Sequence, residues 1–86
     1  MLCQIYRSPR QQEMYLYVEK AQGLEKIPED LLQRFGEPEA IMLVHLDGKR
    51  QLARANADEV IAKIEEQGFY LQMPPTLAEL LRRDGE

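Results

Sequence analysis

Alternating hydrophobic and polar residues predict two strands at the start of the chain. In residues 3–7, Cys3 and Ile5 fall on one side and Gln4 and Tyr6 on the other, which is the two-residue period of a β-strand. Residues 14–19 show the same period, with Met14, Leu16 and Val18 on one side and Tyr15, Tyr17 and Glu19 on the other. Because a short polar connection of residues 8–12 joins them, the two strands are expected to form an antiparallel hairpin.

Two helices are predicted from their end signals and their apolar faces. The first begins at Pro28, a residue suited to the first helical position, and ends before Gly36. Its buried side chains are expected to be Leu31, Leu32 and Phe35. The second helix begins after Asn56, which with Glu59 forms a capping-box-like pair, and ends at Gly68. Val60, Ile61 and Ile64 form its apolar face.

Further strands follow each predicted helix. Residues 41–44 are apolar on both sides, which is typical of a central strand covered on both faces or of one beside a hairpin partner. Asp47-Gly48 predicts a tight turn, and residues 49–54 then predict a polar edge strand. Residues 69–73 alternate as a last strand, which Pro74-Pro75 ends. Thr76 and Glu79 form a capping box that opens a short final helix.

These elements define an α+β fold, in the order ββαββαβα. We expect a mostly antiparallel sheet of about five short strands with two or three helices packed on it, the helices covering one face. The 86 residues are too few for two independent cores, so residues 1–75 are expected to form the domain and residues 76–86 a short C-terminal helix and tail.

Four segments of the chain resemble a known family. They are residues 3–8 (Cys-Gln-Ile-Tyr-Arg-Ser), 14–18 (Met-Tyr-Leu-Tyr-Val), 35–38 (Phe-Gly-Glu-Pro) and 68–75 (Gly-Phe-Tyr-Leu-Gln-Met-Pro-Pro). In this order they resemble the YcgL family of small bacterial proteins. The resemblance implies a compact α/β domain and implies no reaction, cofactor or catalytic residue. In some bacteria the gene of that family lies beside one for ribonuclease D, which associates the family with RNA metabolism.

Composition and charge indicate the kind of protein and the compartment to expect. Hydrophobic residues make up 44% and charged residues 30%, a balance typical of a folded domain. Cys3 is the only cysteine, so no internal disulfide can form, and we expect a cytoplasmic protein. No apolar run approaches the roughly 20 residues needed to span a membrane. The net charge of −4 disfavours general affinity for nucleic acids.

Few side chains are available for catalysis or metal binding. Ser8, Thr76, Cys3 and His45 are each the only residue of their type, and a catalytic triad would need one particular combination of them. His45 has no partner at ligand spacing, so neither a metal nor a cofactor is expected. We therefore expect no enzyme, and an enzyme or metal protein built on His45 and Cys3 is the third of three hypotheses.

Binding of a protein partner is the leading hypothesis for the function. The expected surface combines an apolar strand, a Pro-Pro break and leucines of the final helix. It consists of Phe69, Tyr70, Leu71, Met73, Pro74, Pro75, Leu77 and Leu81. The sequence leaves the identity of the partner and the oligomeric state open.

The alternative is a module associated with RNA metabolism. Tyr15 and Tyr17, with Tyr6 across the hairpin, are expected to form an aromatic row on which bases stack, on the sheet face opposite the helices. The basic residues expected to contact phosphates are Arg7, Arg10, Lys49, Arg50 and Arg54. Cross-strand packing of the tyrosines is the competing interpretation.

Overall fold

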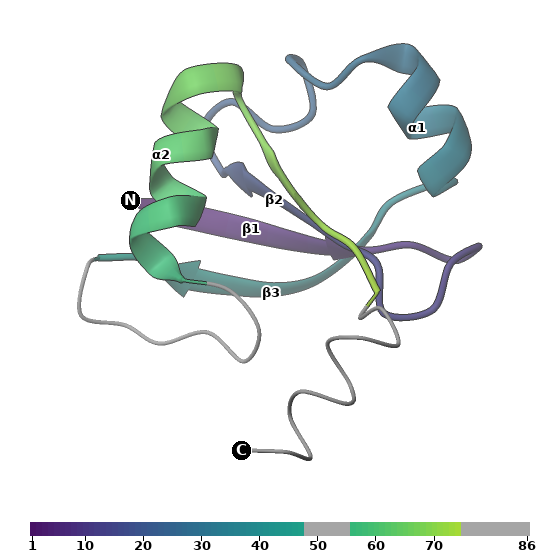
Figure 1. The fold of residues 1–86 in the computed structure, drawn as a ribbon, viewed down its shortest axis with the longest axis horizontal. Helices are drawn as coiled ribbons and strands as arrows, with labels where there is room; N and C mark the ends of the chain where they lie inside the picture. Colours follow the sequence, from purple (N-terminus) through teal and green to yellow (C-terminus); the bar gives the residue numbers. More distant parts are fainter. Residues whose placement is uncertain (48–55, 75–86) are drawn as a thin grey trace, which may run out of the picture.

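Four strands and two helices make up the computed structural model, which describes residues 1–47 and 56–74 (Figure 1). The elements are β1 (Leu2–Arg7), β2 (Tyr15–Glu19), α1 (Glu29–Phe35), β3 (Glu39–His45), α2 (Ala57–Gln67) and β4 (Tyr70–Gln72). The sheet has the order β3-β1-β2-β4, and every neighbouring pair is antiparallel. The predicted α+β class is confirmed.

The hairpin of β1 and β2 has the predicted alternation. Ile5 pairs with Tyr17 and Gln4 pairs with Val18, so each face of the hairpin carries one of the two predicted sets of side chains. The backbone N–H of Ser8 donates to the carbonyl oxygen of Met14 at 3.1 Å, which closes the connection between the strands. The alternation of polar and apolar residues therefore predicted this antiparallel hairpin correctly.

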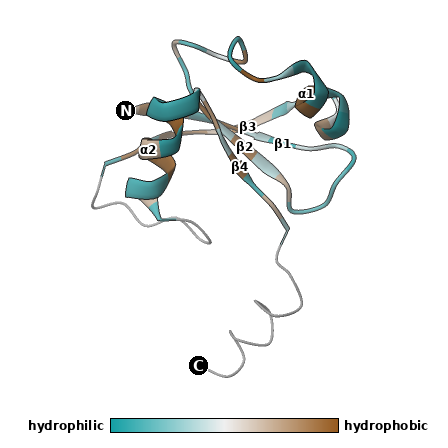
Figure 2. Ribbon diagram, turned by 45° about the horizontal axis from the view of Figure 1, so that its top comes forward, coloured by the Kyte–Doolittle hydropathy of each residue, from teal (hydrophilic) through white to brown (hydrophobic). Residues whose placement is uncertain are grey.

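The two helices lie on opposite faces of the sheet, as the separated hydrophobic clusters and the ribbon show (Figure 2). The α2 side buries Cys3, Ile5, Tyr17, Val44, Leu46, Ala57, Val60 and Ile64. The α1 side buries Met14, Leu16, Val18, Ile27 and Phe35. The expectation that both helices cover one face is wrong. The reason is that β2 is apolar on both sides, because the tyrosine rings pack under α2 as hydrophobic surface.

Both helix ends of α2 follow the predicted signals, whereas α1 begins one residue later than predicted. The Asn56 side chain accepts hydrogen bonds from the backbone N–H groups of Asp58 and Glu59, and Gly68 ends α2 in the left-handed conformation. Pro28 occupies the cap position before α1 instead of its first turn. Neither helix in the part of the chain that the structure describes is long and apolar enough to cross a membrane.

Strand β3 lies at an edge of the sheet formed by the described residues. The interpretation of residues 41–44 as a central strand covered on both faces is therefore wrong, since only Val44 among them is buried. The predicted strand over residues 49–54, the Gly48 half of the predicted turn and the final helix lie outside the described residues.

Candidate functional site

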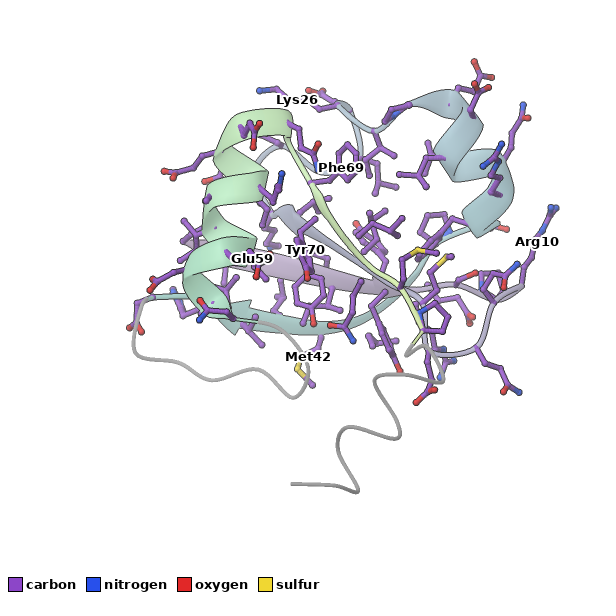
Figure 3. All side chains as sticks on the ribbon, in the orientation of Figure 1. Arg10, Lys26, Met42, Glu59, Phe69 and Tyr70 are labelled. Carbon is purple, nitrogen blue, oxygen red and sulfur yellow. The ribbon has the colours of Figure 1, made fainter. Side chains whose placement is uncertain are left out.

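Three of the four large apolar side chains that are exposed in the described residues follow one another along β3, at the sheet edge. Ile41, Met42 and Leu43 are 43%, 52% and 48% exposed. We call these three residues, with the backbone that carries them, the β3 edge. Figure 3 shows Met42 at the margin of the sheet, away from both helices. A sheet margin of this kind is a common docking site for another chain.

The β3 edge is exposed because neither helix extends over it. Among the residues of β3, only Val44 belongs to a buried cluster, the one beneath α2. Met42 pairs with Ile5 and Leu43 pairs with Gln4, so their side chains point to opposite faces of the sheet. The exposed apolar surface therefore wraps around the margin of the sheet, with one part on each face.

A β-bulge sets the local geometry of this strand. The register shifts between Ile5 and Tyr6, which pair with Met42 and Ala40, so Ile41 is the extra residue. The Gln4 side-chain amide donates to the carbonyl oxygen of Met42 at 2.8 Å. This hydrogen bond satisfies a backbone group beside the irregularity and holds the strand against β1.

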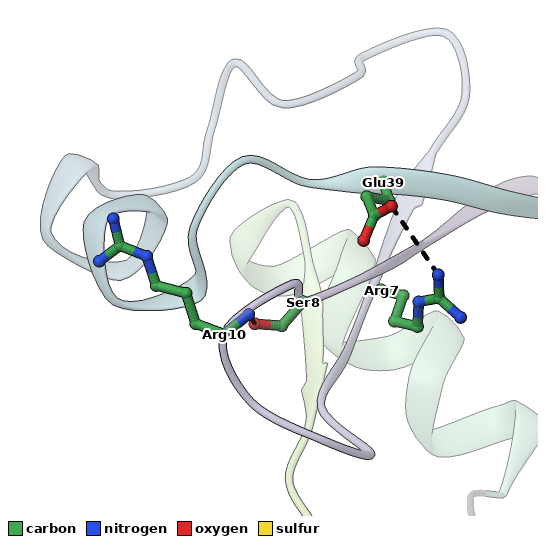
Figure 4. Close-up of polar contacts among 4 residues, drawn as sticks. All are labelled: Arg7, Ser8, Arg10 and Glu39. Carbon is green, nitrogen blue, oxygen red and sulfur yellow. Dashed lines mark hydrogen bonds and ion pairs between the residues drawn. The ribbon is translucent and has the colours of Figure 1, made fainter.

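Charged or titratable groups border the apolar stretch at both ends of β3. The carboxylate of Glu39 lies 3.8 Å from the Arg7 guanidinium, and both side chains are about half exposed (Figure 4). His45 ends the strand and is exposed. Surface pairs such as Arg7 and Glu39 add little stability, but they restrict which strand can lie alongside.

The connection between β1 and β2 is fixed by a buried serine. The Ser8 hydroxyl donates to the carbonyl oxygen of Phe35 and accepts from the backbone N–H groups of Arg10 and Gln11. The Arg10 guanidinium donates to the carbonyl oxygen of Gln33 at 3.1 Å. Ser8 thus holds the loop on the end of α1, a structural role that the sequence analysis did not identify.

The residues proposed for RNA binding are divided between two faces. Tyr15 and Tyr17 lie on the α2 side, whereas Tyr6 packs on the α1 side. Tyr17 is 6% exposed, and its hydroxyl donates to Gln72 Oε1 at 2.9 Å. The Tyr70 ring meets the Tyr17 ring edge-on, with the centroids 5.6 Å apart. The predicted single aromatic row is therefore wrong, because cross-strand packing occupies these rings.

The basic residues of the RNA hypothesis do not converge within the described part of the chain. Figure 4 shows Arg10 pointing toward α1 and Arg7 pointing to the other side of β1, toward Glu39. Lys49, Arg50 and Arg54 lie outside the described residues. Arg7, at the end of β1, and Arg10, in the following loop, therefore form no joint phosphate clamp.

The strand proposed as a partner surface contributes mainly to the interior. Phe69 and Leu71 pack against the α1-side cluster and Tyr70 against the α2-side cluster. Met73 is 52% exposed, and Pro74 is half-buried. Pro75, Leu77 and Leu81 lie outside the described residues. Among the described members of this surface, Met73 alone is a large exposed apolar side chain.

Cys3 and His45 do not face one another. Cys3 pairs with Val44, whereas His45 pairs with Leu2, so the two side chains point to opposite faces of the sheet. Cys3 is fully buried, and burial raises the pKa of its thiol to about 11. No three His, Cys, Asp or Glu side chains are grouped as metal ligands in residues 1–47 and 56–74.

The buried thiol should be unreactive in the folded protein and should make stability sensitive to alkali. Because the pKa of Cys3 is raised from 9.0 to about 11, its contribution is fully present below pH 9 and is lost as the pH rises through 11. The free energy of unfolding should fall by up to about 3 kcal/mol over that range. Urea titrations of the wild type and Cys3→Ala at several pH values between 8 and 11 give the free energy of unfolding of each, and the decrease with pH should be steeper in the wild type. An equal decrease with pH in both proteins, or rapid alkylation of native Cys3 at pH 8, would contradict a buried thiol with a raised pKa.

Together, the antiparallel sheet and the two opposed helices define a small α+β domain. Residues 3–75 match the YcgL domain, and the chain belongs to the YcgL domain family. A YcgL domain-containing protein of Chromohalobacter salexigens is 57% identical over 86% of this chain and 77% of its own length. One of Serratia proteamaculans is 47% identical over 96% and 92%, and the protein YcgL of Escherichia fergusonii is 45% identical over 96% and 86%.

Proposed function

We propose that this YcgL-domain protein is a non-enzymatic accessory domain that binds a protein partner through the β3 edge. The observation that supports the proposal is the run of three half-exposed apolar side chains on a strand at the sheet margin. Proteins usually protect such margins with charged side chains, because exposed apolar edges recruit other strands. An unprotected edge is consistent with surface that a partner covers.

The geometry favours a partner that adds a strand in the plane of the sheet. Met42 and Leu43 point to opposite faces, so a helix lying on one face would cover only one of them. A strand added alongside β3 would place its own side chains on both faces and pair with the backbone along the margin of the described sheet. The partner segment proposed here is therefore extended and apolar in its centre.

Two methionines with the same exposure provide a matched test of where the partner binds. Met42 and Met73 are each 52% exposed, but Met42 belongs to the β3 edge and Met73 follows β4. We expect Met42→Lys to reduce recovery of partner protein by about tenfold or more, because a charge would be buried at the contact. Met73→Lys should stay within about twofold of the wild type.

The measurement is quantitative affinity purification of the tagged full chain from its own cells, with and without nuclease. Thermal unfolding of both variants serves as the control for folding. Loss of binding in Met73→Lys with retention in Met42→Lys would contradict the proposal and place the partner on residues 69–81. Recovery that disappears after nuclease treatment would instead support the RNA-associated alternative.

A further inference from the structure

We infer that the partner segment that pairs with the β3 edge has a lysine or arginine beside Glu39. The inference rests on the proposed function, since it names the charge of the partner that adds a strand alongside β3. It follows from three features of the described residues: the face on which the β-bulge places Glu39, the row of charges that ends at this carboxylate, and a polar hollow beside it.

The β-bulge places Glu39 on the same face of the sheet as Met42. Met42 pairs with Ile5, which is buried on the α2 side. Glu39 pairs with Arg7, which lies two residues from Ile5 on β1 and therefore shares its face. In a strand without a bulge, residues three apart point to opposite faces, and bulges commonly redirect a side chain beside a functional site. A strand added alongside β3 therefore meets an apolar side chain at Met42 and a carboxylate at Glu39 on one face.

Glu39 is the outermost residue of a row of charges across the described sheet. The Arg7 guanidinium approaches its carboxylate to 3.8 Å from β1, on the inner side (Figure 4). Opposite charges on neighbouring strands attract one another, and like charges repel. Because strands lie about 4.8 Å apart, a residue facing Glu39 from an added strand is about 10 Å from Arg7, where repulsion is weaker than the attraction to Glu39. A basic residue is therefore the favourable neighbour on the outer side.

A polar hollow gives a long basic side chain room at this end of β3. It has a volume of about 470 Å³ and is lined by residues 7–13 and Glu39. Of the two arginines in the lining, Arg10 donates to a carbonyl oxygen of α1 and Arg7 faces Glu39, so both cations already have an acceptor. Glu13 contributes a second carboxylate to the lining. The hollow therefore suits the ammonium or guanidinium group of a partner side chain.

These features define a short sequence pattern for the partner. Every neighbouring pair of strands in the described sheet is antiparallel, so the added strand is expected to run antiparallel to β3. Its residue facing Met42 is apolar, and so is the preceding residue, which faces Leu43 on the other side of the sheet. The lysine or arginine beside Glu39 follows two positions after the residue facing Met42, by the same count that separates Ile5 from Arg7 on β1.

Two short peptides test the pattern. Both consist of threonine around an isoleucine-valine centre, and they differ only in the residue two positions after the valine, which is arginine in one peptide and glutamate in the other. Each is titrated at low salt into the isotopically labelled full chain and followed by NMR. We expect the arginine peptide to shift the signals of residues 39–45 with a dissociation constant below about 1 mM, and to bind about fivefold more tightly than the glutamate peptide.

A charge exchange at Glu39 separates a specific contact from the charge of the whole molecule. Glu39→Lys should reverse the preference, so that the glutamate peptide binds more tightly than the arginine peptide. Glu65→Lys, which changes the net charge equally at an exposed position of α2, should keep the preference for the arginine peptide. Because Glu39 and Arg7 are about half exposed, loss of their ion pair should leave the fold intact, and circular dichroism of each variant checks this.

Equal affinity for the two peptides overturns the inference, as does a preference for arginine that Glu39→Lys retains. Signals of residues 39–45 that neither peptide shifts up to about 1 mM also overturn it. If recovery of partner protein from cells still depends on Met42 in any of these cases, this inference alone fails, and the proposed function stands with a partner of different charge. If that recovery does not depend on Met42, both fail.

Discussion

Truncating Phe35 to alanine is expected to lower the free energy of unfolding by about 3–5 kcal/mol. Phe35 is fully buried and is the one residue of α1 in that state, so it anchors the helix to the sheet. It packs in the cluster that contains Leu16 and Val18 of β2. A domain of this size has a total stability on the order of 5 kcal/mol, so the variant should be largely unfolded at 37 °C.

Urea unfolding followed by circular dichroism measures this effect. Leu31→Ala is the matched control on the same helix, because Leu31 is only half-buried and should cost about 1 kcal/mol. A Phe35→Ala variant that loses less than about 1 kcal/mol would show that α1 is not held to the sheet by this side chain.

Replacing Tyr17 with alanine should cost about 3–5 kcal/mol, whereas Tyr15→Ala should cost much less. Tyr17 is buried beneath α2, contacts the Tyr70 ring and donates a hydrogen bond to the buried Gln72. Its truncation removes apolar packing and leaves the Gln72 oxygen without this donor. Tyr15 is half-buried at the margin of the same cluster.

Thermal and urea unfolding of Tyr17→Ala and Tyr15→Ala measure how much each tyrosine contributes to stability. The comparison also decides how RNA-binding data would be interpreted, because loss of binding in Tyr17→Ala would reflect unfolding. Tyr15→Ala is the variant suited to testing a nucleic-acid contact. Equal stability of Tyr17→Ala and the wild type would contradict the buried position of this ring.

Local signals predicted the elements of the fold well. The alternation of residues 3–7 and 14–19 identified the hairpin and its two faces, and Asn56 and Gly68 marked the ends of α2. These signals depend on backbone geometry within a few residues of one another. The burial of Cys3 also agrees with its place on the apolar side of the first predicted strand.

The arrangement of the helices and strands in space was harder to predict from the sequence. A phenol ring has an apolar body and a polar tip, so Tyr15 and Tyr17 can face either solvent or a helix. The sequence analysis expected them on the face without helices, and it therefore predicted both helices on the other face. Residues 41–44 are as apolar as a central strand, although they lie at the edge of the sheet that the described residues form, and three of the four are exposed. An apolar run of this length occurs in exposed strands as well as in buried ones, and its sequence does not show where the strand lies in the sheet.

Contact through the β3 edge is tested most directly by crosslinking from within the strand. A photo-crosslinking amino acid is incorporated at position 42 or, in a separate chain, at position 73, and living cells are irradiated. We predict a discrete crosslinked protein species from position 42 and none above background from position 73. Crosslinks that form from position 73 alone, or equally from both, would contradict a role for the β3 edge as the surface through which this domain makes contact.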